Sequence, residues 1–202
     1  MQVMGSSAHD RSVTSAARRS QIIAATIEVI AAVGYRQASF ARIAERARLS
    51  STRLISYHFA DKDELIGAVA WDVIASIGKF VGARVSAERS AAGMLRAYIE
   101  STVEFTATHR SRMTALLELV LSGAFPYEQT TDVQTVGHVE AILRTGQANG
   151  EFRDFDPAVV ATAVQRAVEG LPFILQARPD LDCTAYAREL VTLFDLGTRA
   201  AP

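Results

Sequence analysis

The stretch from Ser39 to Phe59 constrains this chain most strongly, because it reads as two short helices joined by a tight turn. Apolar residues recur in its first half at the i, i+3, i+4, i+7 spacing of one helix face: Phe40, Ile43, Ala44 and Ala47. Ser39 precedes them, where a hydroxyl can accept a hydrogen bond from a free N–H of the first turn. In the second half Ser50 or Ser51 can act as the cap, and the apolar residues at helical spacing are Leu54, Ile55 and Phe59. Two short amphipathic helices in this order predict a helix-turn-helix.

The second predicted helix keeps one face free of large aliphatic side chains. That face carries hydrogen-bonding groups and one cation: Ser51, Thr52, Arg53, Ser56, Tyr57 and His58. Such a helix can lie in a major groove of double-stranded DNA. Arg53 is the candidate for a base contact, because a guanidinium matches the two acceptors of guanine. Thr52 and Ser56 can reach bases or phosphates, whereas Tyr57 and His58 are expected at the DNA backbone.

The residues after Phe59 predict the start of a long helix. Asp61 and Glu64 have the spacing of a capping box. Lys62 falls in the first turn, where the helix dipole favours an anion over a cation. A DNA phosphate would explain a lysine there. Lys62 therefore joins the predicted DNA-binding set, as does Ser39 at the start of the first short helix.

Residues from about Ser20 to Val69 resemble the DNA-binding domain of the TetR family of transcriptional regulators. The resemblance rests on an ordered series of residues: Ile23, Ala25, Gly34-Tyr35, Ser39, Ile43-Ala44, Ala47, Ser50, Tyr57-His58-Phe59, Lys62, Glu64 and Leu65. The chain departs from the family at Arg48, where the turn usually carries glycine, and at Ser56, where many members have tyrosine. The resemblance implies an all-helical, homodimeric regulator without enzyme activity. It further implies a repressor that leaves a palindromic operator when a small-molecule effector binds.

Helical patterns continue along the rest of the chain, and no run of alternating β-branched residues bounded by hairpin turns predicts a strand. The expected fold class is therefore all-α, with an N-terminal three-helix helix-turn-helix domain and a C-terminal helical domain. Residues 1–14 lack periodicity and are expected to form a disordered arm. Residues 15–66 are expected to form the DNA-binding domain, and residues 67–202 the ligand-binding and dimerisation domain.

The last two predicted helices, about 157–176 and 182–197, carry apolar residues on more than one side. Helices that are apolar over a wide arc need cover on both sides. A symmetric dimer can provide it by pairing these two helices with those of a second copy, and the TetR resemblance implies the same arrangement. The alternative is that these residues form the core of a monomer.

The charge of the chain is unevenly distributed although the net charge is −1. Residues 1–66 hold nine Lys or Arg and six Asp or Glu, giving +3, and residues 67–202 hold twelve and sixteen, giving −4. A basic N-terminal part suits a polyanionic partner. No uninterrupted apolar stretch reaches the ~18–20 residues of a membrane span, and the N-terminus lacks an apolar signal core. A cytoplasmic protein without a membrane partner is expected.

Motifs of enzymes and metal sites are missing from the sequence. It contains no phosphate loop, dinucleotide fingerprint, His-Glu-x-x-His motif or nucleophile elbow. The single cysteine, Cys183, excludes an intramolecular disulfide framework and a four-cysteine zinc site. No catalytic residue, metal or cofactor is therefore expected.

A small-molecule site is expected in the C-terminal part, where helices would enclose a mostly apolar cavity. The candidate ligand-binding residues are aromatic, apolar or imidazole side chains: Trp71, Phe105, His109, Met113, Leu117, Phe125 and His138. Each of them can instead be plain core, and the two histidines can lie on the surface. A rival for the whole chain is a helical ligand-binding protein that has lost sequence-specific DNA binding. An activator is a second rival to a repressor, since the position of the operator decides between them.

Overall fold

The computed structural model describes residues 6–126 and 131–200. In these two ranges every regular element is a helix, and the only β feature is an isolated bridge between Phe152 and Arg199. The predicted all-α class is confirmed.

The helices pack into two compact units. Unit 1 holds the chain up to Val73 together with Ser111–Phe125, and unit 2 holds Ile74–Arg110 and the chain from Pro126 onward. Helix α4, Lys62–Val85, is continuous and contributes residues to both units. The expected domain boundary after residue 66 therefore falls inside a helix and stays a prediction.

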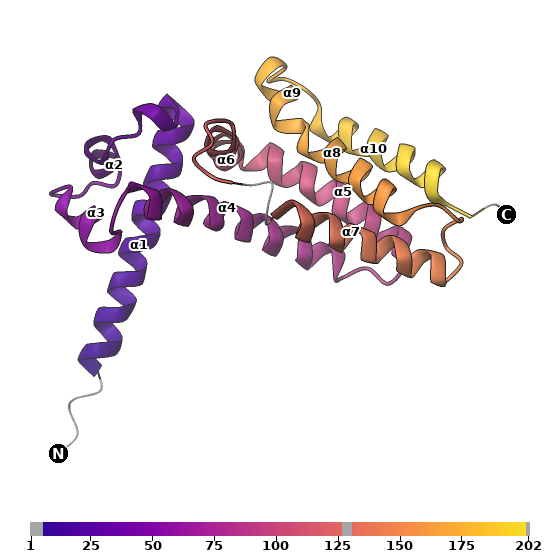
Figure 1. Ribbon diagram of the computed structural model, residues 1–202, viewed down its shortest axis with the longest axis horizontal. Helices are drawn as coiled ribbons and strands as arrows, with labels where there is room; N and C mark the ends of the chain where they lie inside the picture. Colours follow the sequence, from indigo (N-terminus) through magenta and orange to yellow (C-terminus); the bar gives the residue numbers. More distant parts are fainter. Residues whose placement is uncertain (1–5, 127–130, 201–202) are drawn as a thin grey trace. The chain divides into compact units, whose positions relative to one another are not determined.

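Unit 1 is built on five elements besides the first part of α4: α1 (Ser6–Val33), the 3-10 turn η1 (Tyr35–Gln37), α2 (Phe40–Arg46), α3 (Arg53–His58) and α6 (Arg110–Leu121), of which Arg110 belongs to unit 2. Helix α1 buries Ile22, Ile27 and Ile30, and both α2 and α3 contact it (Figure 1). The helix-turn-helix pair therefore has an apolar support.

Helix α1 begins at Ser6, so the expected disordered arm of residues 1–14 is wrong for residues 6–14. The reason is visible in the sequence. Between Gly5 and Gly34 there is no glycine or proline, the two residue types that most disfavour a helix interior. Residues 1–5 of the expected arm lie outside the described residues.

Unit 2 is a helical bundle around α5 (Ala91–Thr108), which contacts α7, α8, α9 and α10 (Figure 1). The bounds of these neighbours are Thr131–Ala148, Pro157–Glu169, Leu171–Ala177 and Cys183–Thr198. The core is largely aliphatic, with Ile99 of α5, Leu143 of α7 and Val164 of α8 almost fully buried.

Two of the predicted helix starts in unit 2 are confirmed, and one predicted helix is divided. Asp156 caps α8 by accepting hydrogen bonds from the N–H groups of the first turn, and Asp182 caps α10 in the same way. The helix expected over 157–176 is instead two helices that meet at Gly170. Pro172 explains the break, because it lacks an N–H and its ring would clash with the carbonyl four residues earlier in a continuous helix.

Two helical stretches are long and apolar enough to cross a membrane by length and composition alone: Lys62–Val85 and Pro157–Ala177. The expectation of no membrane span rested on uninterrupted apolar runs, whereas these stretches carry charged residues such as Asp72 and Glu169. Both residues form ion pairs within their units, Asp72 with Arg112 and Glu169 with Arg166. One or two such helices are weak evidence for a span, since core helices pass the same test.

Candidate DNA-binding surface and ligand-binding residues

Helix α2 forms as the sequence predicts. The Ser39 hydroxyl accepts a hydrogen bond from the Arg42 N–H at 3.3 Å and caps the helix. Ile43, Ala44 and Ala47 are buried. Ser39 itself is exposed, which leaves the start of α2 open to a partner.

The turn after α2 closes with the hydrogen bonds of a Schellman motif. The Leu49 N–H donates to the Ala44 carbonyl at 2.8 Å, and the Arg48 N–H donates to the Glu45 carbonyl at 3.0 Å. This motif places its residue after the cap in the left-handed region, and Arg48 has φ = 52°. Helix ends with this geometry normally have glycine at this position, whereas here the residue is Arg48.

Helix α3 presents the predicted polar face to solvent. The Ser51 hydroxyl accepts from the Arg53 N–H at 3.1 Å, so Ser51 stabilises the start of this helix. Ile55 and Phe59 are buried on the opposite side. The exposed residues are Ser51, Thr52, Arg53, Ser56 and Tyr57, the last with 81 % of its surface accessible. The structure therefore brings five of the predicted DNA-binding residues together on one open surface.

His58 and Lys62 are less free than the other predicted residues. His58 is half-buried, its ring edge lies against Tyr57 with centroids 5.1 Å apart, and its carbonyl accepts a hydrogen bond from Arg19. Lys62 is half-buried as well, with its Nζ 4.5 Å from the centroid of the Tyr35 ring. Both residues can border a DNA backbone, but packing within unit 1 already restrains them.

The predicted capping box at the start of α4 is confirmed and is tied to α1. The Asp61 carboxylate accepts from the Glu64 N–H, and the Glu64 carboxylate accepts from the Ala60 N–H, both at 2.7 Å. Arg19 donates to Glu64 at 3.0 Å and lies over the Phe59 ring at 4.1 Å. The hydrogen bonds from Ala60 and Arg19 lower the pKa of Glu64. The contacts of Arg19 with Glu64 and Phe59 could not be predicted from the sequence, because these partners lie about 40 residues further along the chain.

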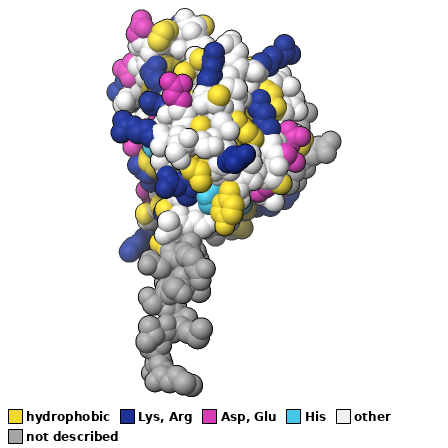
Figure 2. All heavy atoms as spheres, turned by 90° about the vertical axis from the view of Figure 1, so that its left-hand side faces the viewer, with side chains coloured by type: hydrophobic (Ala, Val, Ile, Leu, Met, Phe, Trp, Pro, Cys, Tyr) yellow, Lys and Arg dark blue, Asp and Glu magenta, His cyan; other side chains and the backbone are white. Residues whose placement is uncertain are grey.

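The cations of unit 1 divide into paired and free groups. Arg19 pairs with Glu64, and Arg46 pairs with Glu28. Within the described residues, Arg36, Arg48 and Arg53 are exposed and their side chains have no ionic or hydrogen-bonding partner. Figure 2, which faces the side of α2 and α3, shows Lys and Arg side chains spread over the visible surface with fewer Asp and Glu. These three free cations add positive charge to the surface of unit 1, which suits a polyanionic partner.

The predicted ligand-binding residues fall into different units. Trp71, Met113, Leu117 and Phe125 belong to unit 1. There the Trp71 ring meets the Phe125 ring edge-on at 5.7 Å, Phe125 is buried, and Met113 and Leu117 are half-buried.

Phe105, His109 and His138 belong to unit 2. His138 is exposed on α7, with its Nδ1 2.7 Å from the Gln134 carbonyl oxygen one turn earlier. Neither unit therefore contains the whole predicted set.

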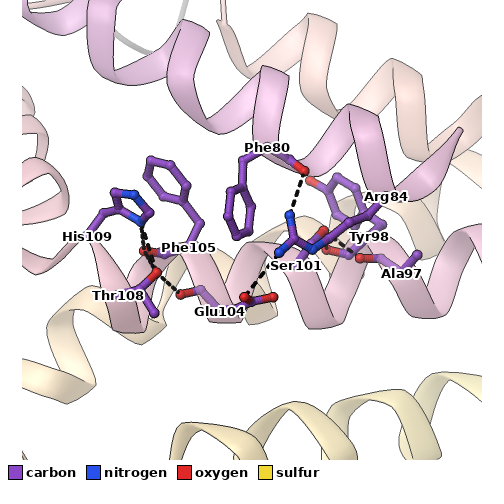
Figure 3. Close-up of polar contacts among 9 residues, drawn as sticks. All are labelled: Phe80, Arg84, Ala97, Tyr98, Ser101, Glu104, Phe105, Thr108 and His109. Carbon is purple, nitrogen blue, oxygen red and sulfur yellow. Dashed lines mark hydrogen bonds and ion pairs between the residues drawn. The ribbon is translucent and has the colours of Figure 1, made fainter. Parts of the chain in front are cut away.

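Phe105 and His109 form a ring cluster with Phe80 of α4 (Figure 3). The Phe105 and His109 rings are stacked, with centroids 4.2 Å apart and planes at 8°. The Phe80 ring meets both edge-on, and the Arg84 guanidinium lies 3.6 Å above Phe80 while pairing with Glu104 at 3.1 Å. Aromatic faces, an imidazole and an ion pair thus converge here. Phe80 and Arg84 had no sequence signal beyond helical periodicity.

A separate cavity of about 350 Å³ lies in unit 2 beside α5 and α10. Its apolar wall includes Leu95, Ile99 and Phe194, and its polar rim includes Arg96 and Asp195. None of the predicted ligand-binding residues lines it. Its volume is within the range of small-molecule sites.

Comparison with known proteins agrees with this geometry. Residues 22–69 match the family described as bacterial regulatory proteins, tetR family. Over 103 residues the chain is 36 % identical to the HTH-type transcriptional regulator BetI of Cronobacter sakazakii, covering 50 % of each chain. BetI of an Escherichia coli strain is 36 % identical over 102 residues, which cover 50 % of this chain and 52 % of that protein. The chain thus spans about half the length of the curated relatives it matches.

Solved structures resemble the chain over most of its length. A TetR-like transcriptional regulator from Rhodococcus sp. RHA1 has a TM-score of 0.74 and 20 % identity, covering 89 % of this chain and 94 % of its own. AibR in complex with isovaleryl coenzyme A and operator DNA has a TM-score of 0.74 and 19 % identity, covering 87 % and 97 %. At these identities the likeness shows the fold. The family match itself covers residues 22–69, which are similar to the DNA-binding domain of tetR-family regulators, and the solved structures extend the likeness in fold over most of the chain.

Proposed function

We propose that this chain is a one-component transcriptional regulator that binds double-stranded operator DNA as a homodimer. The exposed polar face of α3 carries the proposal. Each subunit would place the segment from Ser51 to His58 in a major groove, and two copies would read the half-sites of an imperfect palindrome. Its relatives are named transcriptional regulators, which agrees with a protein that is not an enzyme. A DNA partner implies a cytoplasmic location.

The residues of the surface take different roles in this proposal. Arg53 is exposed, free of partners within the described chain and suited to a guanine, so it reads sequence. Thr52 and Ser56 contact bases or phosphates. Tyr57, His58 and Lys62 contact the DNA backbone, which positions the protein without reading the bases.

Exposed apolar side chains of unit 2 support the dimer. Val159 of α8, Phe173 of α9, and Leu193 and Leu196 of α10 are all exposed in the single chain, Leu193 with 62 % of its surface accessible. The alternative of a monomer core does not explain them, because the fold of one chain leaves them uncovered. A second copy that pairs α8–α10 with their equivalents would bury them.

A small-molecule effector in unit 2 would release the operator in this proposal, which makes the protein a repressor. The ring cluster of Phe80, Phe105 and His109 supplies aromatic surface with an ion pair beside it. AibR, a protein of similar fold, has been crystallised in complex with isovaleryl coenzyme A and operator DNA. Helix α4 carries residues of both units, so a shift of this helix can link the effector to the DNA. The coupling needs a state preference of ~1–3 kcal/mol.

Arg53→Ala tests the proposed readout by fluorescence anisotropy. The probes are the DNA upstream of the protein's own gene and a scrambled duplex of equal length. We expect a loss of ~1–3 kcal/mol in binding free energy on the native sequence and little change on the scrambled one. An equal loss on both would make Arg53 a phosphate contact. Weak, equal binding of both duplexes by the wild-type protein would favour a ligand-binding protein that lost sequence-specific DNA binding.

A further inference from the structure

Arg48 has a backbone conformation that its residue type disfavours. It is the only non-glycine residue with positive φ among residues 6–126 and 131–200. Elsewhere the chain uses glycine for this purpose: Gly34, Gly123 and Gly150 follow the ends of α1, α6 and α7 with φ values of 70–79°. Only after α2 does an arginine take this conformation, which an L-residue with a Cβ adopts at a cost in energy.

Contacts within the described chain do not explain this arginine. Its side chain is exposed and forms no hydrogen bond, ion pair or ring contact there. Its neighbours differ, since Arg46 pairs with Glu28 and Arg42 donates to Gln37 at 3.4 Å. The backbone motif of the turn would form at least as well with glycine. The arginine side chain therefore costs stability and gains nothing inside the fold.

The position of Arg48 points to a partner outside the fold. The residue lies in the turn between α2 and α3, ahead of Arg53, and both side chains are free cations. When the second helix of a helix-turn-helix enters a major groove, the first helix crosses the sugar-phosphate backbone. The turn between them then lies close to phosphates, where a free guanidinium forms charge-assisted hydrogen bonds.

We infer that Arg48 is a phosphate-binding residue of the DNA interface, held in a strained turn because its contact with DNA outweighs the cost. This inference rests on the proposed DNA-binding function. It assigns Arg48 to the positioning of α3, whereas Arg53 reads the bases. Strain that persists at a functional position is the pattern expected when the function needs that side chain.

Arg48→Gly separates the inference from a purely structural role, because it changes stability and DNA binding in opposite directions. We expect a higher thermal unfolding midpoint, since the strain is removed, together with weaker binding of the native and scrambled duplexes by the same factor. The dependence of log K on log salt should become shallower by about one. Between 50 mM and 200 mM salt, the wild-type affinity should fall about 3.5-fold further than that of the variant.

Two control variants isolate the cause. Arg48→Lys keeps the positive charge and the strained backbone conformation. It should therefore bind DNA with the salt dependence of the wild type and show no rise in the thermal unfolding midpoint. Arg178→Ala removes one exposed cation from unit 2, whose side chain has no partner in the described chain, and should leave DNA binding unchanged.

Three results would overturn the inference. The first is an Arg48→Gly protein that is more stable but binds both duplexes as tightly and with the same salt dependence as the wild type. The second is a loss confined to the native sequence, which would make Arg48 a base-reading residue. The third is a wild-type protein that binds neither duplex in a salt-dependent way. That last result is seen without any variant and overturns the proposed function as well.

Discussion

Gly146 in α7 offers a test of how tightly unit 2 is packed. A Cβ added at this position would lie 2.1 Å from a ring carbon of Phe152. Phe152 is 5 % exposed and belongs to the core cluster, and it also lines the cavity beside α5 and α10, so a shift of its ring would disturb core contacts. Ordinary carbon–carbon contacts are ~3.5–4.0 Å, so the ring or the helix would have to move by more than about 1 Å. Glycine is therefore required here by packing rather than by backbone conformation.

The expected effect of Gly146→Ala is the sum of two opposing contributions. Alanine is better than glycine in a helix interior by ~1 kcal/mol. Overpacking costs ~1–3 kcal/mol, and the severity of this contact places it near the upper end. The variant should therefore lose about 2 kcal/mol in its free energy of unfolding. Gly137→Ala is the matched control in the same helix, because nothing lies within 4 Å of its added Cβ, and it should gain ~1 kcal/mol.

Urea unfolding followed by far-UV circular dichroism measures both variants, at one protein concentration because an oligomer's stability depends on it. Trp71 belongs to unit 1 and is not the probe of choice for unit 2. The difference between the two variants should be about 3 kcal/mol. Equal stabilisation by both substitutions would refute the packing argument. Adding Phe152→Leu to Gly146→Ala should cost less than the sum of the single changes, because the two sites share one contact.

Two further predictions concern polar contacts of unit 2. Glu151 accepts hydrogen bonds at 3.1 Å from the N–H groups of Ala91 and Ala92 at the start of α5, and the bonds from Ala92 and Ala91 lower its pKa. Glu151→Ala should cost ~1–2 kcal/mol in thermal or urea unfolding, as the loss of a helix cap does. Because folding lowers the pKa of Glu151, the wild-type protein should be more stable than Glu151→Ala by the whole amount at a pH above the ordinary glutamate pKa. This difference in the free energy of unfolding should disappear as the pH falls through the pKa of the folded state. A difference that persists in strong acid would contradict the prediction. Tyr98, whose pKa is raised by burial and by Glu169, stays protonated and donates to the buried Gln165 side chain. Tyr98→Phe should destabilise the protein by ~1–3 kcal/mol, because the Gln165 side-chain oxygen loses its hydrogen-bond donor. The double variant Tyr98→Phe, Gln165→Leu should lose less stability than the sum of the two single variants. A loss equal to that sum would argue against the contact.

The helix-turn-helix could be predicted from the sequence almost residue by residue, since its signals are local. Ser39, the apolar stripe of α2 and the Asp61–Glu64 capping box all act within one or two helical turns, and the structure confirms each. The exposed face of α3 follows from the same periodicity. The start of α1 was misjudged because a segment without an apolar stripe can still be helical when nothing interrupts it.

The ligand-binding residues could not be placed from sequence. Trp71 and Phe105 are similar apolar positions on neighbouring helices, yet they belong to different units. Which side chains meet depends on helix rotation and on contacts between distant segments, and neither leaves a local signal. The ring cluster needed Phe80, which periodicity alone does not distinguish from other core residues.

The sequence alone thus determined the helical class, the order of the first helices, their caps and the polar face of α3, because these depend on interactions between near neighbours in the chain. Only the tertiary structure decided that α4 belongs to two units, that Gly146 must accommodate Phe152, and that Arg48 stands free in a left-handed turn. These features arise where residues distant in the sequence come into contact, or where the chain turns sharply between two helices. Their geometry depends on how whole helices pack, and a short segment of sequence does not specify that packing.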